Sequence, residues 1–308
     1  MEINVIRGGM LTTVQDLGRA GQRSAGVPLG GPMDPFALRV ANLLVGNAAD
    51  AAVLECTLLG PELVFSADTL IALGGAEFEG LAAWQPKVVS AGSRLKLGAA
   101  RKGSRGYLAV AGGIDVPVVL GSRSTYVRAG FGGFQGRALR DGDVLPGVDV
   151  TRRLTNHWRI DPRILPGYAE SATVRVVRGA QLEEFGGALF AAEFKILPQS
   201  DRMGLRLGGA KLTRIGGAAE LVSSAVAPGS VQVPPDGQPI VLMADAQTLG
   251  GYPQAAHVIS VDLPLMAQLR PGDRVKFAEV SLEQAQKLAY DREHVIALLR
   301  EGLAEKFR

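Results

Sequence analysis

Hydrophobic and polar positions alternate along the chain in short runs that are typical of β-strands. Runs of about four residues, rich in Val, Ile and Leu, recur from end to end and are separated by glycine and proline. The expected strands are residues 3–6, 70–73, 94–97, 107–110, 173–177, 240–243, 258–261 and 274–277. Short strands with such punctuation predict a mainly β fold made of barrels or sandwiches.

Two segments instead repeat apolar residues at helical spacing. The first has Asp34 at the N-cap position and Pro35 at the first helical position, and Gly46 ends it. The second opens with Ser281 and Gln284, the two ends of a capping box, and runs amphipathically towards the C-terminus. We expect a few short helices and a terminal helix that packs against a barrel.

The two halves of the chain look like distant copies. Arg7 and Arg178 stand at matched positions before a glycine, and 64 and 63 residues separate them from the strands at Ile71 and near Val241. Duplication predicts two related barrels, at residues 1–160 and 161–308, with the terminal helix in the second domain. The boundary is expected in the polar, proline-bearing stretch 151–171.

Composition and charge limit the class of protein, its partners and its cellular compartment. Of the 308 residues, 47% are hydrophobic and 20% charged, with both signs interleaved, which is typical of a globular protein. A net charge of +3 without a basic, aromatic run argues against a nucleic-acid partner. Without a membrane-length apolar stretch or a signal peptide, we expect a cytoplasmic protein that does not enter a membrane. The single Cys56, in an apolar run typical of a buried strand, suits a reducing compartment.

The first segment with candidate chemistry is the long, glycine-rich stretch of residues 12–47. Loops of this length often serve function. Arg19 is able to bind a carboxylate or phosphate, and Asp34 to orient a substrate amide or act as a base. The structural alternatives are an ion-pair partner for Arg19 and a helix cap for Asp34.

A second segment, residues 230–262, places hydrogen-bonding side chains beside flexible backbone. Asp245 and Gln247 end a strand, and Gly250, Gly251 and Tyr252 follow. Backbone at paired glycines can approach a ligand closely. The alternative is a hairpin whose glycines serve only its turn.

Two further segments are weaker candidates. Residues 200–207 surround a glycine with Asp201, Arg202 and Arg206, which fits an anion site or a solvated turn. The glycine-rich residues 128–137 can be read as a phosphate cradle but lack the Lys and Ser/Thr of a Walker loop. The three histidines, His157, His257 and His294, lack metal-ligand spacing, so no metal site is expected.

A family resemblance extends over nearly the whole chain up to the terminal helix. The segments that carry it are TTVQDLGR, GVPLGGPMD, ANLLVGN, LECTLLGPELVF, YLAVAGGID, LGSRSTY, SDRMG, QVPPDGQPIVLMAD and GGYPQAAHVISVD, in this order. The chain resembles the family of the C subunit of bacterial 5-oxoprolinase, a carboxyltransferase-like family whose domain is also called allophanate hydrolase subunit 2. The family includes the antagonist of a sporulation-kinase inhibitor.

The resemblance implies a pair of cyclophilin-like β-barrels and an enzyme that is active only in a heteromeric complex. Its partners would be the 5-oxoprolinase B subunit, which resembles the kinase inhibitor, and the A subunit. Together they would open the lactam of 5-oxoproline to L-glutamate with hydrolysis of ATP, with Mg as the accompanying ion.

The resemblance also implies the site residues. Asp34, Arg202 and Asp245 are the expected catalytic residues, with Arg202 as an exposed anion-binding arginine. The expected substrate-binding residues are Arg19, Gln232, Gln247, Gly250, Gly251 and Tyr252. The chain departs from the family pattern at Ala246 and Leu249, where similar proteins commonly have arginine and threonine.

Two other functions fit the same resemblance. One is carboxyl transfer from biotin to urea or a related amide, which requires separate proteins because the chain has no AMKM-like biotin acceptor. The other is a non-enzymatic antagonist of a kinase inhibitor. A free-standing chain favours 5-oxoprolinase over the carboxyltransferase.

Overall fold

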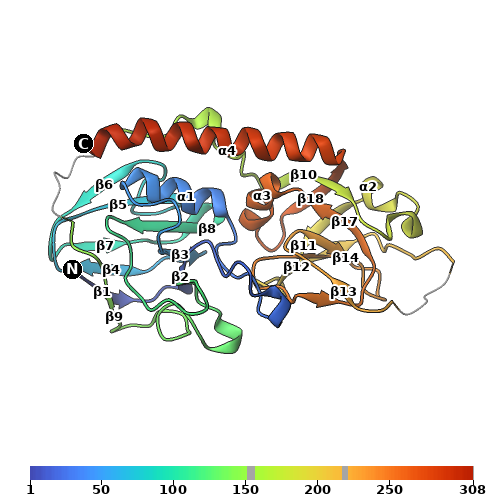
Figure 1. The fold of residues 1–308 in the computed structure, drawn as a ribbon, viewed down its shortest axis with the longest axis horizontal. Coiled ribbons are helices and arrows are strands. Elements are labelled where there is room, and N and C mark those ends of the chain that lie inside the picture. The colour runs from blue at the N-terminus through green and yellow to red at the C-terminus, as the bar shows by residue number, and fades with distance from the viewer. Residues whose placement is uncertain (151–156, 217–220, 308) are drawn as a thin grey trace. The chain divides into compact units, whose positions relative to one another are not determined.

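A computed structural model describes residues 1–150, 157–216 and 221–307 of the chain. Its contacts divide the chain into two units (Figure 1). Unit 1 comprises Met1–Arg19, Gly30–Pro166 and His294–Arg308, and unit 2 comprises Ala20–Leu29 and Gly167–Glu293. Of the stretch expected to hold the boundary, residues 151–156 lie outside the described residues.

This division corrects the single boundary expected after residue 160 in two places. Residues 20–29 belong to unit 2, where the Arg23 guanidinium donates a hydrogen bond to the Val226 carbonyl. The last turns of the terminal helix belong to unit 1, where Ile296 and Leu303 are buried in an apolar cluster. Neither contact leaves a signal in the local sequence.

Unit 1 consists of two antiparallel sheets around a core. One has the strand order β2 (Leu11–Gln15), β3 (Val53–Thr57), β8 (Ala100–Val110), β5 (Thr69–Phe78) and β6 (Pro86–Val89). The other has the order β7 (Arg94–Lys96), β4 (Glu62–Phe65), β1 (Glu2–Arg7) and β9 (Val144–Pro146). Register shifts in β5 after Gly75 mark irregular pairing with β8, and such bulges bend a strand.

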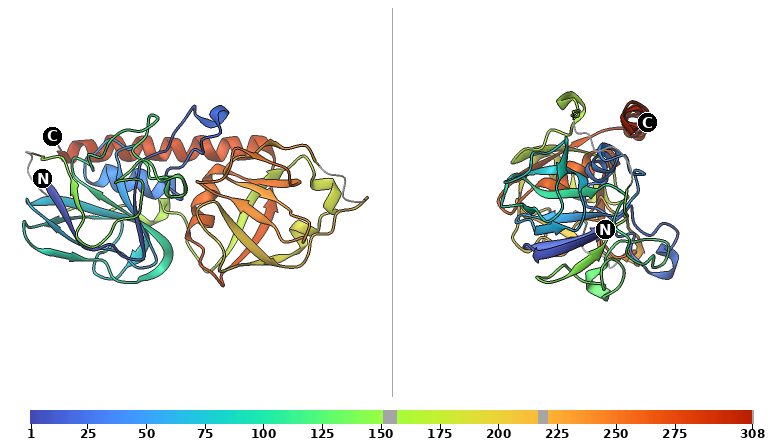
Figure 2. Two further views of the ribbon diagram at one scale, coloured as in Figure 1. Left: turned by 90° about the horizontal axis from the view of Figure 1, so that it is seen from below. Right: turned by 90° about the vertical axis from the view of Figure 1, so that its left-hand side faces the viewer.

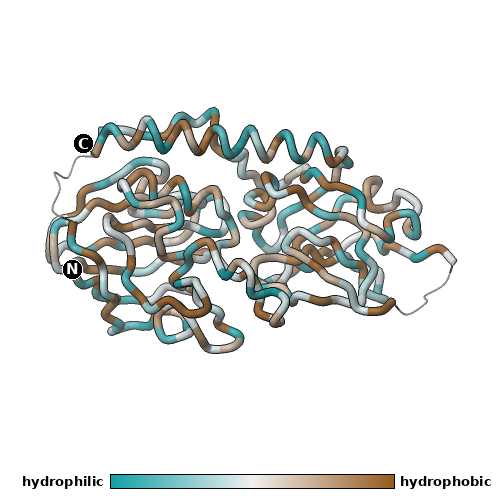
Figure 3. The backbone as a smooth tube through the Cα atoms, in the orientation of Figure 1, coloured by the Kyte–Doolittle hydropathy of each residue, from teal (hydrophilic) through white to brown (hydrophobic). Residues whose placement is uncertain are grey.

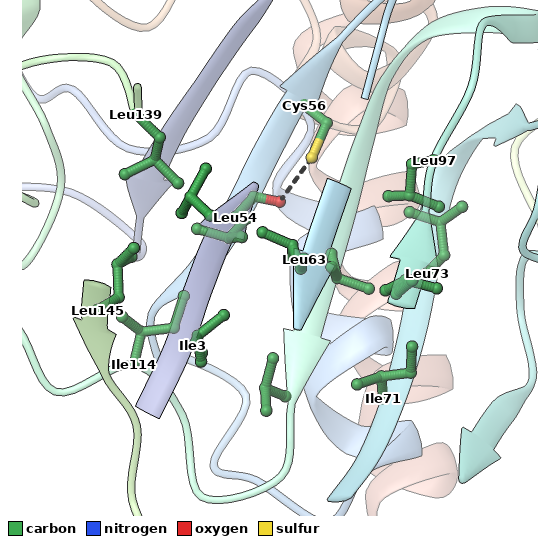
Figure 4. Close-up of a cluster of buried hydrophobic side chains, with 14 of the residues drawn as sticks. Ile3, Leu54, Cys56, Leu63, Ile71, Leu73, Leu97, Ile114, Leu139 and Leu145 are labelled. Atoms are coloured by element: carbon green, nitrogen blue, oxygen red, sulfur yellow. Dashed lines mark hydrogen bonds between the residues drawn. The ribbon is translucent and has the colours of Figure 1, made fainter. Parts of the chain in front are cut away.

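The unit 1 core is filled by aliphatic side chains from both sheets. Ile3, Leu54, Leu63 and Ile71 point towards one another in Figure 4 and are completely buried. Cys56 lies in the same cluster, as its apolar sequence run predicts. Burial raises the pKa of the Cys56 thiol to about 12.

Helix α1 (Pro35–Leu44) packs on β5 and β8. The expected cap is confirmed, because the Asp34 carboxylate accepts a hydrogen bond of 2.9 Å from the Ala37 N–H. Gly74 of β5 permits the close approach, since a β-carbon there would lie 2.4 Å from the Ala37 carbonyl oxygen.

Unit 2 contains a closed barrel, as predicted. Its strands run in the order β10 (Ser171–Arg178), β17 (Gln254–Val258), β14 (Ser230–Gln232), β15 (Ile240–Leu242), β12 (Gly204–Gly209), β11 (Glu193–Ile196) and β18 (Arg274–Glu279). The pairing of β10 with β18 is parallel and closes the ring, which the left view of Figure 2 shows. A separate pair, β13 (Ser224–Ala225) and β16 (Leu249–Gly250), lies outside the barrel.

Short helices complete the fold. They are α2 (Ala188–Ala191), α3 (Leu263–Gln268), and the 3₁₀ turns η1 (Arg23–Ala25), η2 (Val127–Ala129), η3 (Pro162–Ile164), η4 (Leu182–Phe185), η5 (Ser260–Asp262) and η6 (Glu305–Phe307). The strand expected at residues 258–261 is wrong after Val258, because the chain turns into η5. There Asp262 is held by a two-point ion pair with Arg175, at 2.6 and 2.9 Å.

The terminal helix α4 (Leu282–Ala304) begins with the predicted capping box. The Ser281 N–H donates to the Gln284 side-chain oxygen at 3.0 Å, and the Gln284 N–H donates to the Ser281 hydroxyl at 3.2 Å. Polar and apolar residues alternate along α4 in Figure 3. Among the helices of the described residues, none has the length and apolar character needed to cross a membrane.

Candidate functional site

The candidate site is a cavity of about 680 Å³ within unit 2, called here the proline cavity. Three of its lining residues are Pro234, Pro235 and Pro253, and the rings of Phe185 and Tyr252 join them. Backbone hydrogen bonds fix the wall: the Val233 N–H donates to the Pro253 carbonyl at 3.0 Å. The Leu212 N–H donates to the Gly237 carbonyl at 2.9 Å.

The charged residues that line the proline cavity differ in their ion pairs and hydrogen bonds within the protein. Arg214 is ion-paired with Glu184, and the exposed Asp236 accepts from the Gln238 N–H at 3.0 Å. Lys211 is exposed, and within the described residues its ammonium has no ion-pair partner. The cavity therefore combines an apolar wall, held by backbone hydrogen bonds, with the positive charge of Lys211, which has no ion-pair partner among the described residues.

Two of the predicted substrate-binding residues line this cavity, and two more lie next to them. Gly251 and Tyr252 line it directly. The buried Gln232 amide donates to the Tyr252 carbonyl at 3.4 Å. A β-carbon on Gly250 would lie 2.5 Å from the Gln232 amide nitrogen, so the Gln232 side chain would have to move to admit a larger residue there. Gln247 is half-buried earlier in the same loop and is outside the cavity lining.

Arg202 and Asp245 form a buried ion pair apart from the cavity lining. The two guanidinium nitrogens Nε and Nη2 donate to the two carboxylate oxygens at 2.8 and 2.9 Å. Only 8% and 7% of the two side chains are exposed, so the expected exposure of Arg202 is wrong. Its role in binding an anion stays a prediction. The pairing of β12 with β15 brings the two residues to the same end of the barrel.

The family departures lie near this ion pair in sequence. Ala246 is buried in a small apolar cluster with Val226 and Leu242. Leu249 is 60% exposed on β16. Alanine therefore continues the apolar packing at a position where a buried arginine would require a partner.

In unit 1, Asp34 belongs to a buried polar network. The Asp34 N–H donates to the Tyr107 hydroxyl, which donates to the Glu55 carboxylate, both at 2.8 Å. The same Glu55 oxygen accepts from the Met33 N–H at 2.9 Å. Burial, followed by the Glu55 charge, raises the pKa of Tyr107 well above its usual value, which keeps the phenol a donor.

Sequence reasoning missed Glu55 and Tyr107, although both lie in the quoted family motifs. The signal was a charged and a hydroxyl-bearing residue inside otherwise apolar strands, since such groups must find partners when buried. Lys211 was also missed, because nothing in its local sequence places it against the proline-rich turn.

Arg19 is 1% exposed in unit 1. Its guanidinium donates to the Ser124 carbonyl and lies 4.8 Å from the centre of the Phe131 ring. These contacts order the loop around Phe131. A direct contact between Arg19 and a substrate stays a prediction.

The glycine-rich residues 128–137 pack closely against neighbouring atoms, and their role as a phosphate cradle stays a prediction. A β-carbon on Gly133 would lie 1.9 Å from the Thr125 hydroxyl, and one on Gly136 would lie 2.0 Å from the Gly130 carbonyl oxygen. The glycines thus allow the loop to pack tightly on itself. Arg137 is held by both oxygens of Asp143, at 2.7 and 2.8 Å. Within the ranges that the structure describes, no three His, Cys, Asp or Glu side chains form a group suited to a metal ion.

Comparison with known proteins supports the resemblance seen in the sequence. Residues 25–279 match the family described as carboxyltransferase domain, subdomain A and B. The chain is 43% identical to the C subunit of 5-oxoprolinase from Escherichia coli (strain K12), over 94% of this chain and 95% of that protein. It is 39% identical to the C subunit of 5-oxoprolinase from Haemophilus influenzae, over 96% of both chains.

The fold is shared with a larger enzyme. The crystal structure of the K. lactis urea amidolyase superimposes with a TM-score of 0.90 and 31% identity over 97% of this chain. This chain spans 20% of the length of that protein. Taken together, the two-unit β architecture, the ordered motifs and these matches show that the chain belongs to the carboxyltransferase domain family, subdomains A and B.

Proposed function

We propose that this chain is the C subunit of an ATP-dependent 5-oxoprolinase. The observation that carries the proposal is its 43% identity to the E. coli protein of that name, along 95% of that protein's length. The A and B subunits would be its partners, and the complex would work in the cytoplasm. The absence of a disulfide at Cys56 in the described structure is compatible with such a reducing compartment.

In the proposed reaction, the lactam C–N bond of 5-oxoproline breaks and a water oxygen is added to the carbonyl carbon. The ring nitrogen takes a proton and becomes the amine of L-glutamate, while a second water is consumed as ATP becomes ADP and phosphate. Opening an amide in this way depends on positioning and charge stabilisation. The buried Cys56, with its raised pKa, is not suited to act as a nucleophile.

The contribution that we propose for this chain is to hold the ring substrate. The proline cavity has the size range, about 300–1,000 Å³, of small-molecule sites. We assign the nucleotide to a partner protein of the complex and derive no step through it from this chain.

Carboxyl transfer is the second candidate function. The 0.90 TM-score with the K. lactis urea amidolyase favours it. Under this alternative, a carboxylated biotin would have to be delivered by a separate protein and the acceptor would be urea or a related amide.

The two candidates are separated by the substrate that the assembled complex consumes. The chain is purified with the A and B subunits and offered 5-oxoproline with ATP, or urea with bicarbonate, ATP, a biotinylated carrier and a biotin carboxylase that charges it. Glutamate and ADP formed from the first mixture alone support the oxoprolinase. Carboxylated urea formed from the second alone would replace it with the carboxyltransferase.

A further inference from the structure

We infer that the proline cavity binds a small monocarboxylate carried on a compact ring, with Lys211 pairing to the carboxylate, and that it does not hold ATP. Under the proposed function, on which the identity of the ligand rests, this ring acid is 5-oxoproline. The cavity would then be the substrate pocket of the complex.

The shape of the cavity wall favours a ring. Pro234 and Pro235 sit in a turn closed by the hydrogen bond from the Gly237 N–H to the Pro234 carbonyl, at 2.9 Å. Pro253 is tied to the same wall through the Val233 N–H, at 3.0 Å. Proline rings have a fixed backbone angle, so the wall loses little freedom when a flat ligand packs on it.

The edges of the wall add aromatic and polar groups. Phe185 is 3% exposed and supplies a fixed apolar face, whereas Tyr252 is 46% exposed at the cavity. The exposed Thr213 contributes a hydroxyl to the lining. This hydroxyl can accept a hydrogen bond from the N–H of a lactam or donate one to its C=O. A ligand with an apolar ring and a few polar atoms matches this mixture.

The charge of the cavity selects a monoanion over a triphosphate. The positive charge of Arg214 is balanced by Glu184, and Asp236 adds a negative charge to the lining. Lys211 remains as the single cation without an ion-pair partner among the described residues. One ammonium can pair with one carboxylate, but it would leave most of the negative charge of a triphosphate unpaired.

The first test is calorimetric titration of the purified full-length chain. The ligands are 5-oxoproline, 2-pyrrolidinone, which has the same ring without the carboxylate, and ATP. The variants are Lys211→Met and, as a matched control, Lys195→Met, an exposed lysine on β11 outside the cavity. We expect 5-oxoproline to bind the wild type and Lys195→Met equally. Lys211→Met should bind it roughly 10-fold more weakly or worse.

The second test uses the complex with the A and B subunits, so that a pocket completed by a partner is also measured. Lys211→Met should raise the KM for 5-oxoproline by roughly the same factor and leave the KM for ATP unchanged. The inference is overturned if Lys211→Met changes neither the affinity of the chain nor the KM of the complex. It is equally overturned if ATP displaces 5-oxoproline from the isolated chain.

The two proposals fail in different ways. Lys211-dependent binding of 5-oxoproline without turnover by the complex would leave the ring-acid site standing and remove the oxoprolinase. Normal turnover with Lys211→Met would keep the oxoprolinase and remove this cavity as its substrate pocket.

Discussion

The buried ion pair between Arg202 and Asp245 gives the sharpest stability prediction. Both side chains are less than a tenth exposed, and two charge-assisted hydrogen bonds of 2.8 and 2.9 Å join them. Removing either partner breaks both hydrogen bonds and leaves the other charge buried, which costs about 3–5 kcal/mol. Arg202→Ala and Asp245→Ala should each destabilise unit 2 by this amount.

Replacing both residues should cost much less than the sum of the single changes. In Arg202→Met/Asp245→Leu, apolar side chains of similar volume fill the space and no buried charge remains. We expect this double variant to lie within about 2 kcal/mol of the wild type or above it. A large coupling energy between the two sites is the signature of the buried pair.

The assay must report on unit 2 alone. Both tryptophans, Trp84 and Trp158, lie in unit 1, so fluorescence follows the wrong unit. Hydrogen exchange of the β12 and β15 amides in increasing urea measures the free energy of opening around the pair. Tryptophan fluorescence then serves as the internal control and should remain unchanged. The reasoning would be refuted if each single variant had a free energy of opening within about 1 kcal/mol of the wild type and the two positions showed no coupling. Arg202 would then be interpreted as an accessible anion-binding group.

Three further outcomes follow from the buried groups. Cys56, whose thiol pKa is raised to about 12, should resist a disulfide reagent at pH 8 in the native chain and react at once in urea; rapid native labelling would contradict its burial. Tyr107→Phe removes the donor to the Glu55 carboxylate and should lower the unfolding free energy of unit 1 by about 1–3 kcal/mol in fluorescence-monitored urea unfolding. The matched Tyr126→Phe should change little, and an equal loss in both variants would argue against the network. Burial lowers the pKa of His257, so its neutral form is the one that the fold favours; stability should be full above the unfolded value of about 6.5 and fall as pH drops below it. In His257→Gln this part of the pH dependence should disappear, and an unchanged pH profile would exclude His257 as its source.

Much of the local structure was predictable because its determinants are adjacent in sequence. Asp34 and Pro35 begin α1, and Ser281 with Gln284 caps α4, because caps depend on residues three positions apart. The barrel of unit 2 was predictable from short strands separated by turn residues. The burial of Cys56 followed from its apolar run.

The incorrect and missing predictions share a different cause, which is contact between segments that are distant in sequence. Arg202 is buried because β12 pairs with β15, bringing Asp245 from 43 positions away. After Val258 the chain leaves the strand, and Asp262 pairs with Arg175, 87 positions earlier. Lys211 reaches the proline wall only through the fold. Local sequence patterns do not encode contacts between distant residues. The exposure of a side chain and its place in a site were therefore harder to predict than the helices and strands.

The most direct test of the proposed function is an omission assay. 5-Oxoproline and ATP are supplied to the A and B subunits with and without this chain, and glutamate and ADP are measured together. The proposal predicts that the two products form in step only when this chain is present. Glutamate formation at an equal rate without the chain would contradict it.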